Sequence, residues 1–111
     1  MADSKMEIFE VTIAQDGTES TVINKSNFSI MGFEVPASMT STALTFKVGA
    51  ASDATVPLRG SDNSAISYTI DNTAGAYYMP AQYTAGYPYF RIVAGSSEAA
   101  ARTIKIYGYK A

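Results

Sequence analysis

The chain has 111 residues, which is enough for one domain with one hydrophobic core. Hydrophobic residues make up 47% of it and charged residues only 16%, which excludes a disordered chain and predicts a surface that is polar but sparsely charged. The net charge of −2 and the lack of a basic cluster exclude a nucleic-acid partner, because binding a phosphate backbone needs several neutralising cations.

Apolar and polar residues alternate with a period of two, which is typical of strands with one face in a core. IFEVTI places Phe9, Val11 and Ile13 on one side, and ALTFKV, IMGFEV, FRIV and TIKIYGY repeat the pattern. Turn residues such as Asp16-Gly17 separate the segments. We predict strands at residues 7–14, 19–26, 28–35, 43–49, 54–59, 65–70, 75–79 together with 87–94, and 102–109. SSEAAAR, residues 96–102, is predicted to be one helical turn or a plain loop.

About eight strands, spaced roughly ten residues apart by polar turns, predict an all-β fold: a single antiparallel β-sandwich or jelly roll. This domain is expected to span residues 1–111, with residues 1–7 as a flexible N-terminal arm. The N-terminus lacks the apolar region of a signal peptide, and no segment reaches transmembrane length. We therefore expect a soluble chain that is made in the cytoplasm and has no membrane partner.

The residue types that usually carry catalysis are absent or scattered. The chain has no cysteine and no histidine, so it can form neither a disulfide nor a Ser/His or Cys/His arrangement. Its acidic residues occur singly, and no glycine-rich phosphate-binding motif is present. Asp62-Asn63 and Asp71-Asn72 are interpreted as tight turns rather than as a calcium site, because they lack the spacing of a calcium loop. We expect no enzyme activity, no cofactor and no metal site.

The stretch YYMPAQYTAGYPYF, residues 77–90, contains five tyrosines. Buried tyrosines fill a core with their rings while their hydroxyl groups find partners at the rim. Exposed tyrosines on a sandwich can instead stack on sugar rings. The second interpretation names Tyr77, Tyr78, Tyr83 and Tyr87 as glycan-binding residues.

The last two long strands predict an outward-facing patch. If Phe90, Ile92, Ile104 and Ile106 share one apolar side, the residues between them face outward. Tyrosine and arginine are enriched at protein interfaces, so this side either contacts a partner or is covered by another segment of the domain. The predicted partner-binding residues are Tyr89, Arg91, Lys105, Tyr107 and Tyr109, with the N-terminal arm as a second contact.

MTSTALTFKVGAASDATVPLRG (residues 39–60), followed by YPYFRIVAGSSEAAARTIKIYGY (residues 87–109), resembles small structural proteins of tailed bacteriophages. The closing strand IKIYGY is also similar to the last strand of galactose-binding-like jelly rolls. The phage resemblance implies a capsid decoration (cement) protein that binds the outside of the assembled major capsid protein lattice, with a homo-oligomer on the capsid as one arrangement. Such a protein is made in the host cytoplasm and resides on the virion surface. The alternative left open is a glycan-binding module of a head fibre, tail or baseplate.

Overall fold

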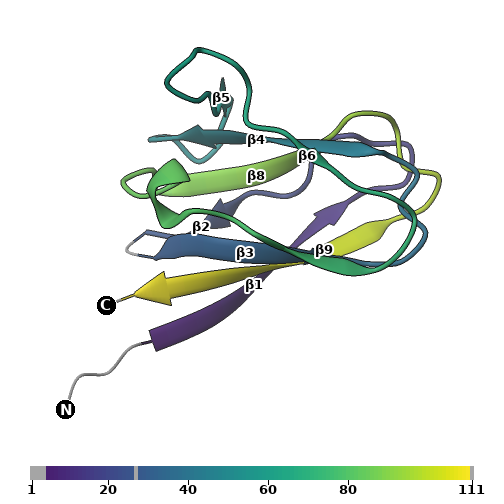
Figure 1. Cartoon of the computed structure of the whole chain (residues 1–111), viewed down its shortest axis with the longest axis horizontal. Coiled ribbons are helices and arrows are strands. Elements are labelled where there is room, and N and C mark those ends of the chain that lie inside the picture. The colour runs from purple at the N-terminus through teal and green to yellow at the C-terminus, as the bar shows by residue number, and fades with distance from the viewer. Residues whose placement is uncertain (1–4, 27, 111) are drawn as a thin grey trace.

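The computed structural model describes residues 5–26 and 28–110, which form two antiparallel sheets packed face to face (Figure 1). Sheet A has the strand order β1-β9-β3-β7, and sheet B has the order β2-β8-β4-β5 with β6 paired to β4. The elements are β1 (Lys5–Ile13), β2 (Ile23–Asn24), β3 (Ser29–Val35), β4 (Ala43–Gly49), β5 (Val56–Pro57), β6 (Tyr68–Thr69), β7 (Gly75–Tyr78), the 3₁₀ turn η1 (Ala81–Tyr83), β8 (Tyr89–Ala94) and β9 (Arg102–Lys110). The predicted all-β sandwich is confirmed.

The core lies between the two sheets and is built by the predicted alternation. Every second residue of β4 and β8 is buried, which follows from the two-residue period of a strand. Phe46 of sheet B lies 5.7 Å from Phe33 of sheet A and 5.6 Å from Phe90, measured between ring centroids. Ile104 and Ile106 of β9 are fully buried in the same cluster. The core therefore joins residues of both sheets in one cluster.

Several predicted elements differ from the structure in extent. Only two residues each of the predicted strands 19–26, 54–59 and 65–70 form regular strands, as β2, β5 and β6. Residues 75–79 and 87–94 belong to different sheets, because β7 pairs with β3 whereas β8 pairs with β4. Residues 5–7 of the predicted arm are part of β1 and pair with β9, and residues 1–4 lie outside the described residues. Within the described ranges, no helix is long and apolar enough to span a membrane.

A buried carboxylate explains why residues 96–102 form no helix. The side chain of Glu98 is fully buried and accepts hydrogen bonds from the backbone N–H groups of Thr40 and Ser41, both at 2.8 Å. The Nε of Arg102 donates a third bond at 3.0 Å. The carbonyl oxygen of Glu98 also accepts a bond from the N–H of Asp16 at 2.8 Å. Glu98 thus connects three chain segments at one end of the sandwich, and these contacts hold residues 96–102 in a loop rather than a helix.

Lys25 is the other fully buried charged side chain within the described residues. Its Nζ donates a hydrogen bond to the carbonyl oxygen of Phe28 at 3.0 Å, and its backbone N–H donates to Pro88 at 2.8 Å. Because burial penalises the charged ammonium, the pKa of Lys25 is lowered from its ordinary value.

Candidate partner-binding face and aromatic groove

The predicted partner-binding residues point outward from opposite faces of the sandwich. β8, which carries Tyr89 and Arg91, is in sheet B, and β9, which carries Lys105, Tyr107 and Tyr109, is in sheet A. The expectation of one shared face is therefore wrong. The two groups of residues lie on opposite faces because the apolar sides of β8 and β9 face each other across the core instead of lying side by side.

On sheet B, the positive charge of Arg91 is used within the domain. One carboxylate oxygen of Glu19 accepts a hydrogen bond from Arg91 at 2.6 Å, and the other accepts one from Nζ of Lys47. The hydrogen bond from Lys47, with the positive charges of both partners, lowers the pKa of Glu19 below its ordinary value although burial opposes the shift. Tyr89 is half-buried. The Arg91 side chain is therefore already paired with Glu19 within the domain.

The outer face of sheet A carries a row in which three strands contribute an apolar side chain and β3 contributes a glycine. By register, Ile8 of β1 lies opposite Tyr107 of β9, Tyr107 lies opposite Gly32 of β3, and Gly32 lies opposite Tyr78 of β7. Ile8 and Tyr78 are 58% and 77% exposed, at the two ends of the row. We call Ile8, Tyr107, Gly32 and Tyr78 the apolar row. Met6 and Met31 beside it are also exposed.

A charged row runs parallel to the apolar row. Glu10 of β1, Lys105 of β9 and Glu34 of β3 lie opposite one another in register, so the charges alternate in sign. The hydroxyl group of Tyr107 donates a hydrogen bond to Glu34 at 2.5 Å, which orients the ring and raises the pKa of Tyr107. The result is an apolar strip bordered by charges of alternating sign, two negative and one positive.

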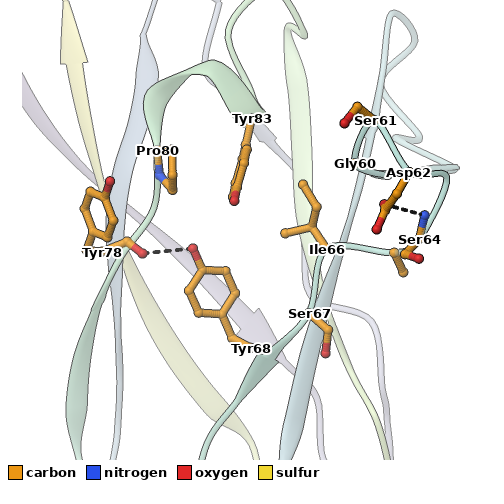
Figure 2. Close-up of a pocket in the computed structure, with 11 residues that line it drawn as sticks. Gly60, Ser61, Asp62, Ser64, Ile66, Ser67, Tyr68, Tyr78, Pro80 and Tyr83 are labelled. Carbon is orange, nitrogen blue, oxygen red and sulfur yellow. Dashed lines mark hydrogen bonds between the residues drawn. The ribbon is translucent and has the colours of Figure 1, made fainter.

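A second candidate site is an open groove of about 700 Å³ between the 60–67 loop, β6 and the segment that leads into η1 (Figure 2). We call it the aromatic groove, because Tyr68, Tyr78 and Tyr83 line it. Tyr68 and Tyr83 extend toward the same space from β6 and η1, as Figure 2 shows. The hydroxyl group of Tyr68 donates to the carbonyl oxygen of Tyr78 at 2.8 Å, and burial is the main cause of the raised pKa of Tyr68. The remaining lining residues are Gly60, Ser61, Asp62, Ser64, Ala65, Ile66, Ser67 and Pro80. The groove therefore combines ring faces with hydroxyl and carboxylate groups.

The four tyrosines named as glycan-binding residues do not form one site. Tyr78 and Tyr83 line the aromatic groove. Tyr87 lies with Tyr83 at a neighbouring depression, and Tyr77 packs inward, its ring stacked on Phe33 at a centroid distance of 5.3 Å. Sequence reasoning missed Tyr68, because it lies outside the tyrosine-rich stretch and only the fold brings β6 next to that stretch.

The acidic turns behave as the sequence predicts. Asp62 accepts a hydrogen bond from the backbone N–H of Ser64 at 3.0 Å, and Asp71 accepts one from Thr73 at 2.9 Å. Both are side-chain turns of the kind that Asp commonly forms. Across residues 5–26 and 28–110, no three residues of the types His, Cys, Asp and Glu gather in a way that could hold a metal ion.

Comparison with known proteins places the fold. No protein-family model matches the chain, and no similar sequence was found among curated proteins. The chain is similar in structure to the SPBc2 prophage-derived protein YomS, with a TM-score of 0.64 and 15% identity over 99% of this chain and 97% of that one. A Bacillus endospore appendage protein of a disulfide-linked pilus family (TM-score 0.40, 10% identity, 98% and 88% coverage) is more distant. So is the Yersinia pseudotuberculosis-derived mitogen (TM-score 0.35, 15% identity, 96% and 86% coverage). The chain shares the fold of the prophage-derived protein.

Proposed function

We propose that the chain is a bacteriophage virion structural protein, and that it is a capsid decoration protein binding the outside of the assembled major capsid protein lattice. The observation that carries the proposal is the apolar row on the outer face of sheet A, with Ile8 and Tyr78 exposed at its two ends and Tyr107 partly exposed between them. The phage-protein resemblance of the sequence and the fold shared with a prophage-derived protein support the assignment to a phage. On this proposal the chain is made in the host cytoplasm and acts on the virion surface, without catalysis or a cofactor.

The chemistry of this face suits docking on a protein lattice. Aromatic and aliphatic side chains at the centre of a contact release water on binding, and a polar border sets the orientation. Lys105 lies between Glu10 and Glu34, so its charge has opposite charges on both sides, and the row keeps one net negative charge for a partner to meet. Because a capsid presents many copies of one surface, copies of the chain that are joined to one another would bind it with avidity.

The test is co-sedimentation of the purified chain with expanded, undecorated phage capsids, with monomeric capsid protein as the comparison. A double variant, Tyr107→Ala with Lys105→Ala, alters the face of sheet A without touching a buried core residue. Val56→Ser is the matched control, because Val56 is 57% exposed on sheet B. We expect saturable lattice binding that the double variant weakens by at least roughly tenfold, the equivalent of about 1.4 kcal/mol, and that the control leaves unchanged. Equal binding by all three proteins would refute the assignment of this face.

Glycan binding is a second candidate function, favoured by the aromatic groove. Tyr68, Tyr78 and Tyr83 surround it, and Asp62 with three serines supplies acceptors and donors for sugar hydroxyl groups. A head fibre, tail or baseplate module would use such a groove. Screening the chain against a glycan array, with Tyr83→Ala and Asp62→Asn as variants, tests this function. Binding that both variants abolish supports it, and binding that neither variant changes contradicts the groove as the site.

A further inference from the structure

The outer edge of β1 is open along its N-terminal half. β1 pairs with β9 along one side and forms the lower edge of sheet A in Figure 1. On its other side, within the described residues, it is bridged at its C-terminal end, where Ile13 pairs with Ser20. At the same end, the carbonyl oxygen of Thr12 accepts a bond from the N–H of Thr21 at 3.0 Å, and the N–H of Thr12 donates to Oγ1 of Thr21 at 3.1 Å. The peptide groups of Thr12 thus point away from β9. Since peptide direction alternates along a strand, those of Met6, Ile8 and Glu10 point to the same edge, where no described residue pairs with them.

This edge differs from the other sheet edges of the described chain. At the far side of sheet A, β7 has only four residues, and the carbonyl oxygen of Tyr78 accepts a bond from Tyr68. In sheet B, the edge strands β2 and β5 have two residues each. Proteins usually protect long edges with proline, bulges or very short strands. Met6–Glu10 has no proline and pairs with β9 in unbroken register, so this stretch is ready to accept another strand.

We propose that two copies of the chain associate by antiparallel pairing of β1 with β1 about a two-fold axis at Ile8. Ile8 then lies opposite Ile8 of the second copy, and Met6 lies opposite Glu10 of the second copy. Thr21 blocks the edge beyond Glu10, because it occupies the peptide groups of Thr12. An axis at Ile8 pairs Met6–Glu10 of the two copies, stops short of Thr12 in both, and joins the two copies of sheet A into one continuous sheet.

The side chains favour a second copy as the occupant of this edge. The apolar row ends at the open edge with Ile8, and the two-fold axis places the same exposed side chain of the second copy beside it. Met6 is 60% exposed, and the pairing places it against the aliphatic part of the second copy's Glu10. The two Glu10 residues are four positions apart along the strand, which is about 13 Å. This separation exceeds the screening length of about 8 Å in physiological salt, and each Glu10 lies opposite Lys105 of its own sheet. The contact is therefore self-complementary, as a two-fold interface requires.

Disulfide cross-linking tests the register directly, because the chain has no cysteine of its own. Residues that exchange both backbone hydrogen bonds in an antiparallel pair have Cα atoms about 5.5 Å apart, within the range that a disulfide bridges. We expect Ile8→Cys to form covalent dimers under mild oxidation on a non-reducing gel. Glu10→Cys is the matched control on the same strand and face, and it should form no covalent dimer and run as a single chain on the same gel. A mixture of Met6→Cys and Glu10→Cys should give the mixed dimer, although neither variant alone forms one.

Sedimentation of the full chain provides an independent measurement. The wild type is expected at twice the chain mass of 11.8 kDa, and Ile8→Pro at the mass of one chain. Proline removes only the N–H that points to the open edge, so the circular dichroism of Ile8→Pro should remain that of the native sheet. A wild type that stays monomeric at about 1 mM, which excludes all but the weakest association, overturns the proposal. So does cross-linking of Glu10→Cys that is as efficient as that of Ile8→Cys. If Ile8→Pro fails to fold, the cysteine variants still decide the register.

Discussion

Replacing Glu98 with glutamine is expected to lower the stability of the domain sharply, although the two side chains have nearly the same shape. The carboxylate accepts hydrogen bonds from the N–H groups of Thr40 and Ser41 and from Arg102. A glutamine amide offers one acceptor oxygen, and its NH₂ group turns a donor toward a second donor. One backbone N–H therefore loses its partner in a buried position, and Arg102 loses its counter-charge.

The magnitude follows from these contacts. A hydrogen bond to a charged group contributes about 1.5–3 kcal/mol, and a buried donor without a partner costs about 1–3 kcal/mol. Arg102 retains partial access to solvent, so the loss of its ion pair adds little. We expect the free energy of unfolding to fall by about 3 kcal/mol. For a domain of this length that corresponds to a decrease in Tm of about 12 °C.

Thermal unfolding followed by circular dichroism at pH 7 measures this change. Glu10→Gln is the control, since Glu10 is exposed on sheet A, and its Tm is expected to stay within about 2 °C of the wild type. A decrease in Tm for Glu98→Gln no larger than that of the control would refute the reasoning.

The pH dependence gives a second check on Glu98. Burial alone would raise its pKa, but the hydrogen bonds from Thr40 and Ser41 and the interaction with Arg102 outweigh it, so the pKa lies below its ordinary value of 4.5. The stabilisation is then complete above pH 4.5 and is lost as the pH falls through the lowered pKa. The wild type and Glu98→Gln should converge in stability over that acidic range. A difference that stays constant with pH would contradict the role of the carboxylate charge.

Three further predictions concern single contacts. The pKa of Lys25 is lower in the folded chain than its ordinary value of 10.5. The wild type should therefore gain stability relative to Lys25→Met as the pH rises toward 10.5. Urea unfolding at several pH values in that range measures the difference. Tyr68→Phe keeps the ring but removes the bond to the Tyr78 carbonyl oxygen, and should cost about 1 kcal/mol in urea unfolding; a neutral result would mean that this bond adds nothing. Gly32→Ala places a Cβ 2.7 Å from a backbone oxygen of β7 and should lower the free energy of unfolding by about 1–3 kcal/mol. Gly75→Ala is the control, because its Cβ meets nothing closer than 3.5 Å. Equal Tm values for the two variants would contradict this prediction.

The strands could be predicted from the sequence because their signal is local. Alternation in ALTFKV and TIKIYGY identifies both the strand and its buried side, and β4 and β9 lie where the pattern predicts. The short strands were harder to predict. β2, β5 and β6 pair over two residues each, and their extent depends on how loops cross the sheet edges. For residues 96–102 the sequence left open a helical turn or a plain loop, and the structure shows the loop, held by partners of Glu98 that lie 57 and 58 positions away.

The candidate sites depended more on tertiary structure than the fold did. The sequence alone determined that Tyr107 and Arg91 point away from the core, because each alternates with buried residues. It could not determine that they lie on opposite faces, since alternation specifies which side of a strand is buried but not which sheet the strand joins. That choice rests on pairing between distant segments, here β9 with β1 and β3, and β8 with β4. The apolar row, the aromatic groove and the open edge of β1 all arise from this pairing.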